Sequence, residues 1–244
     1  MKSPSWHRDE IILALDLYRT LDARDMTKNN PKVVELSELL NKLPIYKESM
    51  KGEKFRNTNG VQLKLSNFKA IDPNFEGQGM SSYSKNDKEV FFEFMGKDRE
   101  LHSIANQIKL AVSNEEVNHK LSQIQDEESD GDYSVKEGKV IYKLHKLRER
   151  DRRLNSKKKA QYLKKHGKLD CEVCKFDFYK TYGDLGKGFI EAHHRVPLSE
   201  IDGEKTTRLE DLALVCSNCH RMLHRSISID VLIDILIEKS MSNS

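Results

Sequence analysis

Four cysteines, arranged as two C-x-x-C pairs, restrict the fold of this chain more than any other feature. The pairs are Cys171 with Cys174 and Cys216 with Cys219. Four thiolates supplied in this way form a closed tetrahedral zinc site, and a closed site is structural. The 41 residues between the pairs exceed the ~15–20 of a simple zinc ribbon, so we expect a folded segment inside this staple. Redox dithiols are disfavoured because neither pair has a βαβ context.

Four of the nine histidines fall in two short segments inside and just after the cysteine staple. His193 and His194 end a segment of alternating apolar and polar residues, which is typical of a strand that enters a turn. His220 and His224 are four residues apart, so on a helix they share one face and can bind one ion. Any one of these histidines alone would more often be a surface or core residue, but together they are difficult to explain by packing.

These residue types suit the hydrolysis of a phosphodiester. Histidine titrates near neutral pH, so it can deprotonate water. A divalent cation offsets the charge on the phosphate and on the leaving oxygen. Magnesium prefers oxygen ligands, so a site rich in imidazole suits manganese, nickel or cobalt at least as well as magnesium.

The order of these motifs resembles the HNH, or ββα-metal, endonuclease family. The shared pattern is C-x-x-C, then an acid-x-H-H-x-x-P-L segment, then D-L-x-L-x-C-x-x-C-H-x-x-x-H, over about residues 165–226. It is most similar to the McrA-like endonucleases, which restrict modified DNA. The resemblance implies two antiparallel strands, the first with the histidine pair, and a helix with the last two histidines. It also implies a catalytic divalent ion (Mg, Mn, Ni or Co) separate from the structural zinc.

The resemblance further implies a role for each residue of the site. The ligands of the catalytic ion would be His193, His220 and His224. His194 would be the general base that activates water. Asp211 stands where the family usually has an asparagine that braces this base, and an aspartate there would also raise the basicity of the histidine. Arg195 would contact the scissile phosphate, or equally would form a structural salt bridge.

The charge of the chain is distributed unevenly, although its net value is only +3. Residues 136–168 carry 14 basic and 3 acidic side chains, whereas residues 111–135 carry 1 and 7. The basic block favours double-stranded DNA as the partner, and a solvated helix face is the alternative. We expect a long basic helix from about Lys139 to His166, ended by Gly167, and an acidic linker before it.

Residues 1–110 are predicted to form a helical domain, because apolar residues recur there at helical spacing. Near the start of its third predicted helix lie residue types that can contact bases or phosphates: Arg56, Asn57, Asn59, Gln62 and Lys64. A polar turn with an exposed helix face is an equally good interpretation. The domain resembles the helical head domains that precede HNH modules in McrA-like restriction proteins, which implies a sensor of DNA that carries modified cytosine.

These features predict an α+β protein with a mostly helical DNA-sensing domain at 1–110, an acidic linker at 111–135 and an HNH nuclease domain at 136–244. The predicted activity is that of a restriction endonuclease that hydrolyses phosphodiester bonds of modified DNA. The alternatives are an HNH nuclease of another purpose (a nickase, a homing enzyme or a toxin) or a non-catalytic, zinc-stabilised DNA-binding protein.

Three further expectations concern location and assembly. No run of about 18 apolar residues is present, so no membrane span is expected. The first ten residues lack the apolar core of a secretory signal, so we expect a cytoplasmic protein. One such site cuts one strand, so cleavage of a duplex calls for a homodimer. The apolar stretch from Ile227 to Ile237 is the candidate dimer surface, or else it packs onto its own domain.

Overall fold

The computed structural model describes residues 4–77, 82–124, 138–149, 151–195, 207–224 and 229–242. The chain divides into two compact units: the first comprises Met1–Ser129 and Val135–Leu144, and the second comprises Asp130–Ser134 and His145–Ser244. The division between Leu144 and His145 falls inside helix α8 (Lys139–Glu149). The start of α8 is bound to the first unit, because the buried Asp9 carboxylate accepts a hydrogen bond from the Lys139 amide at 2.7 Å.

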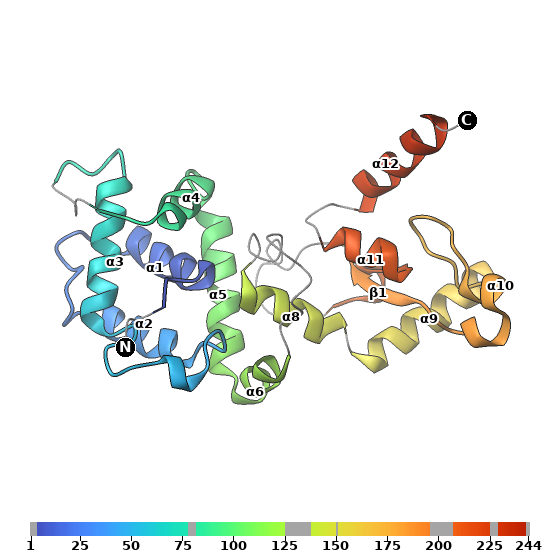
Figure 1. Cartoon of the computed structure of the whole chain (residues 1–244), viewed down its shortest axis with the longest axis horizontal. Coiled ribbons are helices and arrows are strands. Elements are labelled where there is room, and N and C mark those ends of the chain that lie inside the picture. Colours follow the sequence, from blue (N-terminus) through green and yellow to red (C-terminus); the bar gives the residue numbers. More distant parts are fainter. Residues whose placement is uncertain are drawn as a thin grey trace. The chain divides into compact units, whose positions relative to one another are not determined.

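The first unit is helical in its described part and is built around α1 (Figure 1). Residues 11–15 of α1 are each at most 1% exposed, because this helix contacts α2, α3, α4 and α5. The elements of this unit before α8 are α1 (Arg8–Thr20), α2 (Pro31–Lys42), the 3₁₀ helix η1 (Glu48–Met50), α3 (Thr58–Ile71), α4 (Lys85–Glu93), α5 (Asp98–Ser113) and α6 (Glu115–Gln123).

Local sequence determines where these helices begin. Asn30 accepts a hydrogen bond from the amide of Lys32 at the start of α2, and Pro31 takes the first position of that helix. Ser84 and Asp87 form a reciprocal capping box at the start of α4. Helices α4 and α5 are separated by a short turn, in which Gly96 has a φ of +74°.

The segment expected as an acidic linker, 111–135, includes two described helical stretches. Residues 111–124 form the end of α5 and all of α6, and they pack into the first unit through buried side chains such as Leu121 and Ile124. The charge of Glu115 and Glu116 lies on the exposed side of α6, so an acidic composition here reflects a helix surface. Residues 125–137 lie outside the described part.

The second unit contains a two-stranded sheet with helices around it. Its elements after α8 are α9 (Arg152–His166), α10 (Phe178–Tyr182), η2 (Gly183–Gly186), β1 (Glu191–His194), η4 (Leu209–Asp211), β2 (Leu212–Val215), α11 (Ser217–Leu223) and α12 (Ile229–Ser242). The long basic helix expected over 139–166 is interrupted. Asp151 accepts hydrogen bonds from the amides of Arg153 and Leu154 and so caps a new helix, α9. Gly167, at a φ of +71°, ends α9 as predicted.

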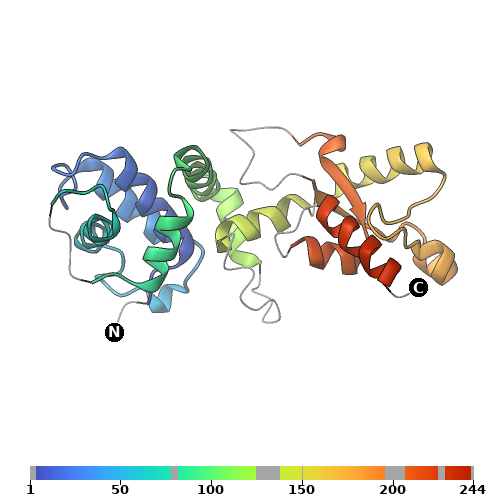
Figure 2. The same cartoon turned by 90° about the horizontal axis from the view of Figure 1, so that it is seen from above.

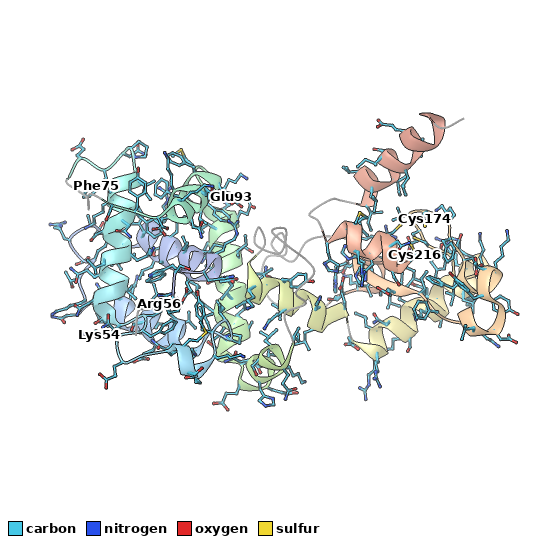
Figure 3. The ribbon with its side chains drawn as sticks, in the orientation of Figure 1. Lys54, Arg56, Phe75, Glu93, Cys174 and Cys216 are labelled. Atoms are coloured by element: carbon cyan, nitrogen blue, oxygen red, sulfur yellow. The ribbon has the colours of Figure 1, made fainter. Side chains whose placement is uncertain are left out.

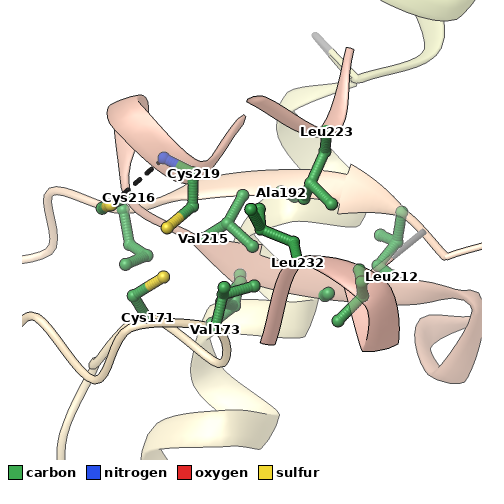
Figure 4. Close-up of a cluster of buried hydrophobic side chains, with 13 residues drawn as sticks. Cys171, Val173, Ala192, Leu212, Val215, Cys216, Cys219, Leu223 and Leu232 are labelled. Atoms are coloured by element: carbon green, nitrogen blue, oxygen red, sulfur yellow. Dashed lines mark hydrogen bonds between the residues drawn. The ribbon is translucent and has the colours of Figure 1, made fainter. Parts of the chain in front are cut away.

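The predicted antiparallel strand pair is confirmed. β1 pairs with β2 from Glu191↔Val215 to His194↔Leu212. Helices α9 and α11 both contact β1, and they lie on opposite sides of it in Figures 1 and 2. Apolar side chains from β2 and from the cysteine loops fill the core between these elements (Figure 4). The sheet thus holds His193 of β1 beside α11, which carries His220 and ends at His224.

Helix α12 both packs against this core and leaves apolar side chains exposed. Ile229 and Leu232 are buried in the core of the second unit. Val231, Leu236 and Ile237 are between 39% and 49% exposed. Ile227, the first residue of the expected dimer surface, lies outside the described part. None of the described helices is long and apolar enough to cross a membrane.

Candidate metal centres and catalytic residues

The four cysteines converge in the second unit. Their Sγ atoms all lie within 4.8 Å of one another, and Cys174 Sγ is 3.6 Å from Cys216 Sγ (Figure 3). Two thiolates on one tetrahedral zinc ion, with bonds of about 2.3 Å, would be about 3.8 Å apart. A disulfide would require about 2.05 Å. The spacing therefore fits a metal–thiolate site.

Both cysteine loops have the same local geometry. The amide of Cys174 donates to Cys171 Sγ at 3.5 Å, and the amide of Cys219 donates to Cys216 Sγ at the same distance. Burial raises the pKa of Cys174 to about 11 and raises that of Cys219 further. Burial also acts to raise the pKa of Cys216, but hydrogen bonds from the Cys219 amide and the neighbouring thiols lower it overall. Without a cation the cluster thus disfavours several thiolates together, and a bound metal would offset their charge.

Three of the four histidines form a second cluster, and Glu149 joins them. His193 Nδ1 and His220 Nε2 lie 2.9 and 3.1 Å from Glu149 Oε1. His224 Nε2 lies 3.3 Å from Glu149 Oε2 and 3.0 Å from His220 Nε2. Three imidazole nitrogens and a carboxylate oxygen, all within 4.8 Å of one another, are a donor set that fits a divalent cation.

Glu191 orients one of these imidazoles. Its Oε2 lies 2.5 Å from His220 Nδ1, and its Oε1 accepts a hydrogen bond from the Ser217 hydroxyl at 2.6 Å. His220 Nε2 is thereby directed to the cluster, as in the carboxylate–histidine–metal arrangement of metalloproteins. Hydrogen bonding to His220 is the main cause that lowers the pKa of Glu191.

The two carboxylates at the histidine cluster, Glu149 and Glu191, favour a bound positive charge. Burial acts to lower the pKa of His220, but hydrogen bonds to Glu149 and Glu191 and their charges raise it to about 9. At neutral pH and without a metal, His220 therefore carries a proton between two carboxylates. A divalent cation would take the place of that proton.

His194 is not part of this cluster. Successive side chains of a strand point to opposite faces, so β1 presents Glu191 and His193 on the α11 side and His194 on the other side. The His194 side chain is buried. Asp211 precedes Leu212, the strand partner of His194, and its backbone oxygen accepts a hydrogen bond from the Arg195 amide at 2.8 Å. Its carboxylate accepts a hydrogen bond from the Arg208 amide at 2.7 Å, which closes the η4 turn.

Arg195 forms an ion pair with Glu172, the residue after Cys171. The other carboxylate oxygen of Glu172 accepts a hydrogen bond from the Leu214 amide at 2.8 Å. The guanidinium thus ties the end of β1 to the first cysteine loop. Of the two roles considered for Arg195, this contact is the structural salt bridge.

Two of the five residues expected to contact DNA are buried in the first unit. The guanidinium of Arg56 donates to both carboxylate oxygens of Glu10, at 2.6 and 2.8 Å, and lies 4.6 Å from the Trp6 ring. Lys64 Nζ lies 2.6 Å from the fully buried Asp87 carboxylate. Both side chains neutralise buried carboxylates inside the unit, and Arg56 is labelled in Figure 3. They are therefore not exposed for contact with DNA.

The other three are at or near the surface of α3. Asn57 caps the helix by accepting a hydrogen bond from the Gly60 amide at 2.9 Å. The Gln62 side chain accepts a hydrogen bond from the Lys28 amide at 3.0 Å. Asn59 is exposed. The structure thus gives Asn57 and Gln62 local structural contacts and leaves Asn59 open to solvent.

We expect Arg56→Ala to lower the free energy of unfolding of the first unit. Removing one partner of a buried ion pair leaves the Glu10 charge uncompensated, which costs about 3–5 kcal/mol. Urea unfolding measures this loss. The matched control is Asn59→Ala, an exposed position where a change within about 0.5 kcal/mol is expected. If the Arg56 variant kept its stability but bound DNA more weakly, Arg56 would contact DNA instead.

Comparison with known proteins agrees with this geometry. The family model described as HNH endonuclease matches residues 171–226, which run from the first cysteine to just past His224. The match lies within the second unit and supports a nuclease that acts on DNA. No curated protein and no solved structure matches the chain.

Two further residues of the site, Glu149 and Glu191, were given no role by the sequence, although Glu191 is the acid of the acid-x-H-H segment. Glu191 stands two residues before His193, so it shares a strand face with it, and this alternation was visible in the sequence. Glu149 is the only acidic residue between 138 and 149, but nothing in the local pattern links it to a histidine 44 residues later.

Proposed function

We propose that this protein is a metal-dependent DNA endonuclease with one catalytic ion and one structural zinc ion. One observation carries the proposal: ring nitrogens of His193, His220 and His224 lie within 4.8 Å of one another. All three histidines belong to the segment that matches the HNH family. The four-cysteine site is proposed to hold zinc, because four thiolates form a closed tetrahedral set. A purely DNA-binding role would not require a second, imidazole-rich donor set.

The proposed reaction uses the chain as follows. His194 accepts the proton of the attacking water, since an imidazole is the side chain best matched to that transfer near neutral pH. Asp211 is proposed to orient His194, since its backbone oxygen accepts a hydrogen bond from the amide of Arg195, the residue after His194. The histidine cluster would hold a divalent ion, and that ion would offset the charge on the phosphate and on the leaving oxygen.

Helix α9 is the proposed contact with the DNA backbone. It carries seven lysine and arginine residues and no acidic residue, and it packs against the sheet that bears the site. Lys158 is buried and Lys159 donates to the Gly188 carbonyl oxygen, so these two are structural. The exposed lysine and arginine side chains at both ends of α9 can contact DNA phosphates. The affinity that such contacts give for DNA falls as the salt concentration rises.

We further propose that the enzyme is a cytoplasmic restriction endonuclease that acts on DNA with modified cytosine. The first unit has its own buried core around α1, which suits a sensor separate from the nuclease. Its likeness to the head domains of McrA-like proteins favours recognition of a modified base. We also propose that two copies act on one duplex, because one ion and one base address one phosphate.

Digestion of one phage DNA in three forms tests this proposal. With Mn²⁺ present, we expect cleavage of DNA that carries 5-methylcytosine or 5-hydroxymethylcytosine and little cleavage of the unmodified form. The His194→Ala variant is the control for a contaminating nuclease. Equal cleavage of all three forms would contradict modification dependence, and no cleavage of any form would contradict the nuclease itself.

A further inference from the structure

We propose that Glu149 is a fourth protein ligand of the catalytic ion, so that the ion is held by three histidines and one carboxylate. This inference rests on the proposed function, since it concerns the same ion. Glu149 ends α8 and lies 22 residues before the segment that matches the HNH family. It therefore adds to the site a ligand that the three-histidine set lacks.

The distances around Glu149 are those of a coordination shell. Two ligand atoms that each lie about 2.1 Å from one ion are about 3.0 Å apart at a right angle and about 3.4 Å apart at the tetrahedral angle. The Glu149 oxygens lie 2.9, 3.1 and 3.3 Å from nitrogens of His193, His220 and His224. The nitrogens of His220 and His224 are 3.0 Å apart. All four separations lie in or within about 0.1 Å of that range.

The position of Glu149 is built into the fold of the second unit. Its side chain is 6% exposed, and its backbone oxygen accepts a hydrogen bond from Asn155 Nδ2 of α9 at 2.6 Å. A carboxylate at this depth costs free energy unless a positive charge compensates it. Three imidazoles offer lone pairs as well as protons, and a divalent ion satisfies the lone pairs and the carboxylate together.

A four-ligand set also restricts which ions can support catalysis. Tetrahedral zinc would be fully coordinated by the protein, as in a structural site. An octahedral ion such as Mn²⁺ would keep about two positions for water and a phosphate oxygen. The carboxylate oxygen also moves the ligand set toward the preference of manganese and magnesium.

Manganese titration of the full-length protein tests this inference without any cleavage assay. The zinc content is first verified, and Mn²⁺ binding is then followed by the electron paramagnetic resonance signal of the free ion. Glu149→Gln should weaken Mn²⁺ binding at least ~10-fold, because even the loss of an outer-shell partner typically costs 10–100-fold. Glu149→Asp, which keeps the charge, should bind more tightly than Glu149→Gln.

The matched control is Glu210→Gln, an exposed carboxylate of the same unit, which should bind Mn²⁺ like the unmodified chain. A second readout is the visible spectrum of Co²⁺ titrated into the zinc-loaded protein, whose bands should shift in Glu149→Gln. Mn²⁺ affinity within twofold of the unmodified chain, with an unchanged Co²⁺ spectrum, would overturn the inference even if DNA were cleaved. Weakened binding without DNA cleavage would support the ligand and count against the nuclease proposal.

Discussion

Cys171→Ser is expected to leave the second unit unfolded or aggregated and without zinc. Cys171 is fully buried in the apolar core, together with Cys216 and Cys219, so the metal site is part of that core (Figure 4). A structural zinc ion contributes about 10–16 kcal/mol of apparent binding free energy. A whole domain is stable by only about 5–15 kcal/mol. Circular dichroism, limited proteolysis and metal analysis measure the loss.

Cys216→Ser should behave in the same way, because both cysteine loops supply ligands. Val173→Ala is the matched control: Val173 lies in the first loop and is 6% exposed, but it offers no ligand. Its loss of two methyl groups should cost roughly 1–3 kcal/mol and leave the zinc bound. If Cys171→Ser protein contained no zinc but kept native resistance to proteolysis, zinc would not be required for folding.

The parts of the site that the sequence predicted are those with short-range patterns. The cysteine loops depend on a spacing of three residues, and His220 and His224 depend on the four-residue repeat of a helix. His193 depends on strand alternation. In each case the local backbone alone brings the donor atoms to one side. The spacing therefore predicted which residues converge, although it did not predict where His194 points relative to them.

The parts that the sequence did not predict depend on distant partners. Arg56 and Lys64 have the residue types of a DNA-reading surface, but their acidic partners stand 46 and 23 residues away. Local pattern cannot show that an acid is buried there, so the sequence placed these cations on the surface. Glu149 was missed for the same reason, since its histidine partners lie 44 to 75 residues further along the chain.

Helix interruptions were missed for a different reason. Residues 139–166 contain no glycine or proline and are strongly basic, so the sequence favoured one continuous helix. Asp151, a good helix cap inside a basic run, was the signal for a break. That break matters for function, because it separates α8, which carries Glu149, from α9, which carries the cations proposed to contact DNA.

His194→Ala is expected to lower the rate of DNA cleavage by at least ~100-fold, because a positioned general base typically contributes 10²–10⁴-fold. His194 lies outside the cluster that would hold the ion, so Mn²⁺ affinity should stay within about twofold. His224→Ala should lose both cleavage and tight Mn²⁺ binding. Conversion of supercoiled plasmid, measured beside the Mn²⁺ titration, separates these two kinds of loss.

The matched control for the His194 and His224 variants is His119→Ala. His119 is an exposed residue of α6, so this variant should cleave DNA like the unmodified chain. The same plasmid assay reports on assembly: a dimer that cuts both strands gives linear product, whereas a single copy gives only open circles. Open circles alone, at all protein concentrations, would make the enzyme a nickase and contradict the dimer. Cleavage by His194→Ala at the unmodified rate would show that another group accepts the proton. The buried position of His194 would then be explained by packing behind β1.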